Sequence, residues 1–310
     1  MLCRLGAAFS TISSSVPTPP CVRGLSVGRR RSGNEKDFLR VLNDGNSSIG
    51  KGEALGVSTL YIVLTSLLAY VARKLAHKFI NEPFVRALFL EGIASAELCG
   101  TCFELIIVAD NFGISTYAVY LFCLTIWWSQ NWGDATACPY THLEDVVQGK
   151  ASLRVAALKI WAELTGGILI YRYVQLLWSL ELVETHEGRA FGECSTDLQI
   201  PVPFGALVEG IATCLCRVAS KALSDLEPRF GTAIDSFIGT ALVVAAFNYS
   251  GGYFNPVLAT SLKYGCHGNT IIEHIVVYWI GACCGAIASV FVYELPVVQD
   301  LVFSNRIKRD

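Results

Sequence analysis

Apolar residues are grouped in long blocks along the chain, separated by short polar stretches. Six blocks are apolar and long enough to form membrane-spanning helices: residues 84–109, 116–132, 153–182, 204–222, 234–249 and 271–295. A helix needs about 20 residues to cross a hydrocarbon core of about 30 Å. Trp and Tyr residues at the block ends are typical of the membrane interface. The pattern predicts a multi-pass, all-α membrane protein embedded in a lipid bilayer.

Two segments precede these blocks. Residues 1–56 are polar, with five Arg and no acidic residue before Glu35, and we expect a disordered extension; a targeting peptide is the alternative interpretation. Residues 57–80 contain a shorter apolar segment that either spans the membrane or lies at its interface. If this segment spans, the N-terminus is lumenal and Asn46, in Asn46-Ser47-Ser48, becomes a candidate for glycosylation.

Charges near the block ends predict the orientation. Lys and Arg are frequent before residue 84, around residues 150–154 and 217–229 and in the tail at 296–310, and are scarce in the loops between. This alternation follows the positive-inside rule and makes the tail cytoplasmic. The formal net charge is -2, which excludes a nucleic-acid partner held by bulk charge. The 12 Cys residues are too dilute for a disulfide scaffold, so we expect most of them to be reduced.

The chain contains an internal repeat. The sequence around Glu91 recurs around Glu209, and Trp161 and Gly167 recur as Trp279 and Gly285, at an offset of about 118 residues. Cys138-Pro139 recurs as Asn255-Pro256 at nearly the same offset. The halves are residues 84–182 and 204–295, each with three spans. An odd number of spans reverses the second half, as in many channels and transporters.

Each X-Pro pair precedes an apolar stretch too short to cross the membrane. Residues 139–149 and 256–264 are predicted to form re-entrant half-helices, with proline in the first turn. Two half-helices entering from opposite sides direct their positive dipole ends at one point near the midplane, which disfavours cations.

These features resemble the aquaporin (major intrinsic protein) family over residues 84–293. Residues 250–257, Ser-Gly-Gly-Tyr-Phe-Asn-Pro-Val, are similar to the second Asn-Pro-Ala loop of that family, with Val257 in place of Ala. Cys138-Pro139-Tyr140 replaces the first Asn-Pro-Ala motif. The degenerate first motif and the additional N-terminal segment resemble the unorthodox, intracellular super-aquaporin branch.

The resemblance implies a fold and a set of roles. The fold is an aquaporin-like bundle of six transmembrane helices plus two half-helices in an inverted repeat, with an additional N-terminal apolar helix. Asn255 would donate to the permeating molecule, and Glu91 and Glu209 would support the two re-entrant loops. Filter positions of water-selective members correspond to Val243, Gly252 and Leu258, so the constriction would lack both its His and its Arg. The second-span filter residue stays open between Tyr117, Tyr120 and Phe122.

Other chemistry-bearing residues receive structural interpretations. We expect His142, Glu144 and Asp145 to form a charged face towards the cytoplasmic vestibule, with His142 as a pH gate the alternative. Cys99 and Cys102 lie in a span and are expected to pack as small residues. No nucleophile set, phosphate loop or metal-ligand pair stands out, so the sequence predicts neither an enzyme nor a cofactor or metal site.

The motifs and the resemblance leave three candidate functions. The resemblance favours a passive, homotetrameric channel for water and small neutral solutes such as glycerol or hydrogen peroxide. A non-conducting membrane scaffold is the alternative, because Cys138 and Tyr140 stand in the pore motif; a gradient-coupled transporter ranks last. The branch favours the endoplasmic reticulum, whereas the mitochondrial or plasma membrane is the alternative location.

Overall fold

The structure is a computed structural model that describes the backbone of residues 33–307 and the side chains of residues 50–302. Residues 1–48 and 49–310 form two units, and the second unit holds the helical bundle. The first half of the bundle contains α2 (Pro83–Phe112), α3 (Ile114–Asn131), α4 (Pro139–Val147) and α5 (Leu153–Trp178). The second half contains α6 (Val202–Leu226), α7 (Gly231–Ser250), α8 (Pro256–Lys263), α9 (Ile271–His274), the π-helix η3 (Ile275–Gly281) and α10 (Ala282–Tyr293). No β-strand occurs within residues 33–307.

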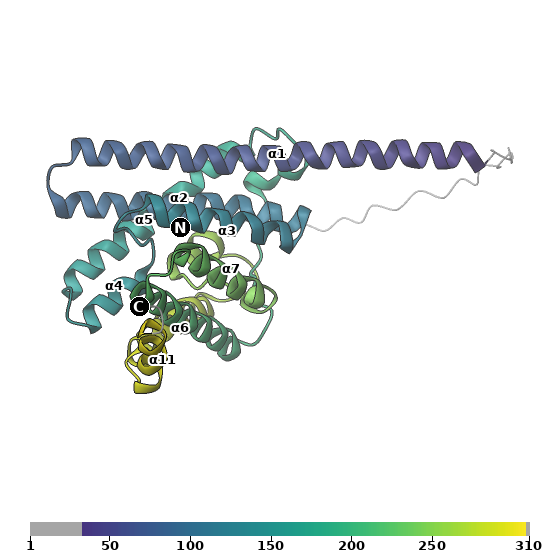
Figure 1. Cartoon of the computed structure of the whole chain (residues 1–310). Helices are drawn as coiled ribbons and strands as arrows, with labels where there is room; N and C mark the ends of the chain where they lie inside the picture. The colour runs from purple at the N-terminus through teal and green to yellow at the C-terminus, as the bar shows by residue number, and fades with distance from the viewer. Residues whose placement is uncertain (1–32, 308–310) are drawn as a thin grey trace, which may run out of the picture. The chain divides into compact units, whose positions relative to one another are not determined.

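Further elements flank the bundle in the described part of the chain (Figure 1). Helix α1 (Gly33–Phe79) precedes the bundle, and α11 (Pro296–Ile307) follows it in the segment expected as a cytoplasmic tail. The connection from α5 to α6 holds two short 3-10 helices, η1 (Glu184–His186) and η2 (Arg189–Phe191). Helix α1 starts at Gly33, inside the segment 1–56 that we expected to be disordered, and residues 35–54 are helical. The targeting-peptide hypothesis and the side chain of Asn46 lie outside the residues described.

Five helical segments in the described chain are long and apolar enough to cross a membrane. They are Gly50–Phe79, Pro83–Phe112, Val202–Leu226, Gly231–Ser250 and Ile271–Tyr293. The first is 30 residues long, which is long enough for the spanning alternative given for residues 57–80. Helices α3 and α5 occupy the other two predicted blocks, but they are less apolar. In α5 the reason is charge, since Arg154, Lys159, Glu163 and Arg172 lie within it.

Local sequence explains several helix starts. The side chain of Glu82 accepts the backbone N–H of Val85 before Pro83 opens α2, and Ser152 caps α5 by accepting from Val155. At Thr270 a complete capping box with Glu273 begins α9. These side chains satisfy amides that the first helical turn leaves without partners. The polar gaps between the blocks therefore also mark the helix boundaries.

The two halves repeat one close helix crossing. A Cβ placed on Gly166 in α5 would lie 2.0 Å from the carbonyl oxygen of Gly92 in α2, and one on Gly285 would lie 2.0 Å from that of Gly210 in α6. Gly92 and Gly210 follow Glu91 and Glu209, as the repeat predicts. The equivalent of Gly285 is Gly166, however, not Gly167 as the sequence offset indicated. The π-helix η3 lies just before α10 and accounts for this shift, because such a bulge accommodates one extra residue.

The described part of α1 packs on the first half of the bundle through polar contacts. Arg73 is buried and forms an ion pair with Glu97 of α2. The hydroxyl of Tyr61 donates to the carbonyl oxygen of Leu177 in α5 at 3.0 Å, and Thr59 pairs with the hydroxyl of Tyr120 in α3 at 2.5 Å. As a result, the most apolar 18-residue window of α2 is 72% buried, whereas that of α6, its counterpart in the second half, is 22% buried.

Candidate pore and its supporting carboxylates

The two half-helices α4 and α8 begin at equivalent backbone positions. Cys138 and Asn255, their N-caps, have φ of -146° in both cases, with ψ of 116° and 112°. The preceding residues, Ala137 and Phe254, both have left-handed backbones, with φ of 52° and 47°. Non-glycine residues rarely adopt this conformation and do so where the surroundings enforce it. Both loops therefore make the same turn into their half-helices.

Asn255 joins the two half-helices at this point. Its Oδ1 accepts the backbone N–H groups of Val257 and Leu258 at 3.0 and 3.3 Å. Its Nδ2 donates to the carbonyl oxygen of Ala137, in the other loop, at 2.8 Å. An amide nitrogen carries two hydrogens, so the second remains for another acceptor.

Cys138 makes the first half-helix chemically different. Its thiol forms no capping hydrogen bond, although the residue is buried. The hydroxyl of Thr141 donates to the carbonyl oxygen of Cys138 at 2.7 Å, but this contact adds no acceptor for the amides of the first turn. The two N-cap positions are equivalent in their backbones, but only Asn255 carries an amide. Because a thiol is a weak donor, the junction of the two loops has one amide donor instead of two.

Each loop is held by a buried carboxylate from the first helix of its own half. Oε2 of Glu91 accepts the backbone N–H groups of Thr136 and Ala137 at 2.9 and 3.1 Å. Glu209 accepts the N–H of Phe254 at 2.7 Å, the N–H of Tyr253 at 3.2 Å and the hydroxyl of Ser250 at 2.6 Å. Both Glu residues are almost fully buried. Non-helical backbone at membrane depth needs such internal acceptors.

His142 does not lie on an exposed face, contrary to our expectation. The residue is 3% exposed, and its Nε2 lies 3.0 Å from Oε1 of Glu163 and 3.4 Å from Oε1 of Glu91. Lys159 approaches the same Glu91 oxygen at 3.4 Å. The half-helix packs inside the bundle, where a buried titratable side chain requires charged partners. This explains why His142 contacts the carboxylates of Glu91 and Glu163.

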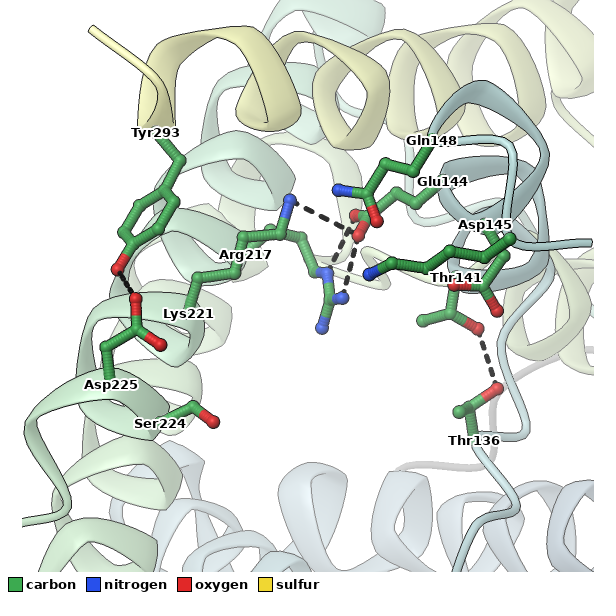
Figure 2. A pocket seen from close by; sticks show the side chains of 11 residues that line it. Thr136, Thr141, Glu144, Asp145, Gln148, Arg217, Lys221, Ser224, Asp225 and Tyr293 are labelled. Carbon is green, nitrogen blue, oxygen red and sulfur yellow. Dashed lines mark hydrogen bonds and ion pairs between the residues drawn. The ribbon is translucent and has the colours of Figure 1, made fainter.

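Glu144 and Asp145 line a cavity of about 440 Å³ between α4 and α6 (Figure 2). Glu144 is buried and paired with Arg217 of α6 at 2.8 and 2.9 Å, and Lys221 lies 3.3 Å from it. The guanidinium of Arg217 also lies 5.8 Å from the centre of the Tyr140 ring. The other lining residues are Thr136, Thr141, Gln148, Lys150, Ser224, Asp225 and Tyr293. Glu144 and Asp145 therefore line one cavity, in which Arg217 and Lys221 neutralise Glu144.

The predicted filter residues lie around the second loop. A Cβ on Gly252 would meet the carbonyl oxygen of Val243 at 2.6 Å, so these two residues are in direct contact. Leu258 and Val243 are half-buried beside the main core, whereas Pro139, Pro256 and Val257 are buried. Among the second-span candidates, Tyr117 packs against Phe247 of α7 at 5.3 Å between ring centres. Tyr120 is turned towards α1 through its bond to Thr59.

Asp197 and a disulfide connect the second loop and the end of α8 to the segment that precedes α6. Asp197 accepts the hydroxyl of Tyr253 at 2.5 Å and forms an ion pair with Lys263 at 2.8 Å. Cys194 and Cys266 are joined by a disulfide, which corrects the expectation that the thiols are reduced for this pair. The other eight described Cys residues are free.

Sequence reasoning left three buried carboxylates unassigned. Glu97 accepts the indole N–H groups of Trp127 and Trp132, each at 2.9 Å, as well as Arg73. Glu104 accepts from Trp178 at 2.8 Å and contacts Nε2 of His186 at 2.9 Å. Glu163 contacts His142. The sequence signal for these residues was the presence of acidic side chains inside apolar blocks. Their partners lie on other helices, which the hydrophobic pattern of one segment does not reveal.

Six helices in two inverted halves, with two half-helices meeting between them, define an integral membrane protein of the channel class. No family model matches the chain. Curated relatives are nevertheless similar over most of its length. An aquaporin-11 of Milnesium tardigradum is 27% identical over 253 residues, covering 81% of this chain and 92% of the relative. An aquaporin-12 of Mus musculus is 28% identical, covering 78% and 86%.

One further relative and one solved structure are similar to the chain at lower identity. The aquaporin-11 of Homo sapiens is 22% identical over 245 residues, covering 78% of this chain and 88% of the relative. An aquaglyceroporin structure from Plasmodium falciparum has 14% identity and a TM-score of 0.44, covering 76% of this chain and 98% of that one. The aquaporin-11 and aquaporin-12 relatives confirm the resemblance to the aquaporins and to their super-aquaporin branch. They support a membrane channel and confirm that the chain is not an enzyme.

Proposed function

We propose that the protein is a passive channel for water and small uncharged solutes, such as glycerol or hydrogen peroxide. The observation that carries this proposal is the junction of the half-helices, where Asn255 bridges the two loops and retains a free amide hydrogen. Two helix N-termini directed at this point create a positive field that disfavours cations and protons while neutral molecules pass.

Selectivity is proposed to depend on an apolar constriction. Val243, Gly252 and Leu258 supply no charged or imidazole group at the positions that correspond to the family's filter, and Tyr117 is the proposed second-span member. A site without fixed donors rejects neutral solutes weakly, because no buried polar group is left unpaired when the wrong solute enters. We therefore infer that glycerol and hydrogen peroxide compete with water for passage.

The test uses the purified chain in liposomes. Stopped-flow shrinkage measures water permeability, and solute uptake measures glycerol and hydrogen peroxide permeability. A channel gives rates above those of empty liposomes, scaling with the amount of protein. Rates equal to those of empty liposomes contradict the proposal. Asn255→Asp, which places a negative charge at the junction and removes the amide donor, should lower water permeability without changing reconstitution.

A scaffold without conduction is the second candidate, favoured by one specific contact. The Tyr140 ring lies under Arg217, which is itself paired with Glu144, so a bulky side chain and an ion pair occupy the cytoplasmic side of the first motif. Tyr140→Ala distinguishes the candidates. If this residue blocks the path, the variant conducts water and the natural chain does not.

We further propose an internal secretory-pathway membrane as the location, the endoplasmic reticulum before others. The Cys194–Cys266 disulfide joins two loops that the positive-inside rule places away from the cytoplasm. Disulfides persist in oxidising compartments such as the lumen of that organelle. The homotetramer implied by the resemblance is part of the same proposal. Cross-linking in native membranes, followed by sizing in detergent, measures it.

A further inference from the structure

We propose that Glu91, His142 and Glu163 form a binding site for a divalent transition-metal ion, of which Zn²⁺ is the probe. Nε2 of His142, one carboxylate oxygen of Glu91 and one of Glu163 all lie within 4.8 Å of one another. The three residues come from α2, α4 and α5 and are 1%, 3% and 0% exposed, respectively. Metal binding at this site does not depend on the proposed conduction function.

Two of the three separations between the ligand atoms fit a tetrahedral ion. Nε2 of His142 is 3.0 Å from Oε1 of Glu163 and 3.4 Å from Oε1 of Glu91. Ligand atoms at about 2.0–2.2 Å from zinc are separated by about 3.3–3.5 Å in a tetrahedron. Both distances from His142 are within a few tenths of an ångström of this separation, and the two carboxylate oxygens, which lie within 4.8 Å of each other, would draw together around the ion. One imidazole and two carboxylates favour transition metals over Mg²⁺ or Ca²⁺, which prefer oxygen ligands alone.

The carboxylate of Glu163 gives a second, independent indication of a bound cation. Oε2 of Glu163 is buried, and no described residue donates to it in hydrogen-bonding geometry. The backbone N–H of Cys138 interacts with the same carboxyl group without satisfying this oxygen. A buried carboxylate oxygen without a donor is costly, and a coordinated cation removes that cost.

Glu91 divides its two oxygens between two tasks. Oε2 holds the loop amides of Thr136 and Ala137, whereas Oε1 faces His142 and Lys159. Metal ligation by Oε1 therefore leaves the loop supported. Lys159 is the one competitor for this oxygen that the described structure shows besides His142, and its side chain is 24% exposed, so it can withdraw towards solvent.

The 440 Å³ cavity lies beside the site. Thr136 and Thr141, which line the 440 Å³ cavity, neighbour the cluster: the N–H of Thr136 donates to Glu91, and Thr141 precedes His142. A bound ion would tether the first half-helix to α2 and α5. This tether would act in the half of the molecule where Cys138 provides no cap.

The test titrates the chelator-stripped full chain with Zn²⁺ and Co²⁺ after accessible thiols have been blocked. We expect one zinc per chain and a tetrahedral Co²⁺ spectrum without sulfur-to-metal charge transfer. His142→Gln and Glu163→Gln should each weaken zinc binding by at least about tenfold. His274→Gln, which alters another buried His bonded to Thr260 in the second half, should leave it unchanged.

Zinc X-ray absorption of the natural chain supplies a readout that does not depend on how the variants fold. A first shell of nitrogen and oxygen at about 2.0 Å supports the site. The proposal is overturned by an absence of bound zinc in the natural chain, by sulfur in the first shell, or by equal affinities of the natural chain and His142→Gln.

Discussion

At the scale of single residues, the two loop motifs share a backbone but not a side-chain function. Cys138 and Asn255 have the same φ and nearly the same ψ, yet Asn255 caps two amides and bridges to Ala137, while Cys138 caps none. A side chain at the N-cap stabilises a helix when it carries a hydrogen-bond acceptor. The missing cap therefore weakens the start of α4 without altering its geometry.

We predict that Cys138→Asn stabilises the protein and increases water permeability. The new amide should cap α4, worth about 1 kcal/mol, and should supply the second donor at the junction. Thermal unfolding in detergent measures the first effect, and stopped-flow shrinkage of liposomes at matched protein density measures the second. Cys138→Ala is the control, because it removes the thiol without adding an amide. Equal behaviour of the two variants would show that the cap has no role here.

At the scale of helices, the fold depends on two equivalent crossings. The crossing of α2 with α5, and that of α6 with α10, bring a glycine of one helix onto the backbone of the other. Small residues permit this approach, which polar and dispersion contacts then stabilise in a membrane. The repetition of the contact in both halves makes it the structural counterpart of the sequence repeat.

Gly166→Ala and Gly285→Ala should each destabilise the protein by roughly 1–3 kcal/mol, since overpacking forces the helices apart. In both, the added Cβ would lie 2.0 Å from a carbonyl oxygen of the facing helix. Gly239→Ala is a matched control within α7, because its nearest neighbour is the Cys216 sulfur at 4.0 Å. Thermal unfolding of the three variants provides the comparison. A midpoint for Gly166→Ala as high as that of Gly239→Ala would contradict the crossing.

A third element-level prediction concerns the additional helix α1. Arg73→Met should loosen its packing on α2, because breaking a buried ion pair costs about 3–5 kcal/mol when one charge remains. Glu97 retains its two indole donors, so the lower end of this range is expected. Hydrogen exchange and proteolysis at the described part of α1 report the change. Lys74→Met, at the exposed neighbouring position, should leave both measurements unaltered.

Hydropathy and the repeat were sufficient to place the helices and both half-helices, because long apolar blocks and X-Pro pairs are local features. Three features were not predictable in this way. The π-helix η3 displaces the register of the repeat by one residue. The helix α1 begins within a polar stretch, and the carboxylates at Glu97, Glu104 and Glu163 find partners on other helices. Each depends on tertiary packing, for which a single sequence has no periodic signal.

At the scale of the whole molecule, the two sides of the bundle are built differently. One side holds the cavity with Glu144, Arg217 and Lys221, near segment ends rich in Lys and Arg. The other holds the Cys194–Cys266 disulfide and the Asp197 contacts with Tyr253 and Lys263. From the positive-inside rule we propose that the cavity faces the cytoplasm and the disulfide faces the opposite side of the membrane.

This orientation leads to a prediction about the disulfide, which closes a loop with a sequence separation of 72 residues. Cys194→Ser, Cys266→Ser or reduction should lower the free energy of unfolding by about 2–5 kcal/mol, because the unfolded chain loses a constraint. Water permeability should fall as well, since the same loop positions Asp197 against Tyr253 of the second motif. Thermal unfolding and liposome shrinkage with and without reductant measure the two effects.

Thiol labelling in sealed microsomes tests the orientation separately from stability. Without reductant, a thiol reagent should not react at Cys194 or Cys266, whereas Cys123, which is free and exposed, reacts once the chain is solubilised. After reduction, the two Cys residues should react only with a reagent that crosses the membrane. Labelling of reduced Cys194 by an impermeant reagent in intact microsomes would place this loop in the cytoplasm. That result would reverse the bundle in the membrane and remove the argument for a lumenal disulfide, while leaving the half-helix junction as it is.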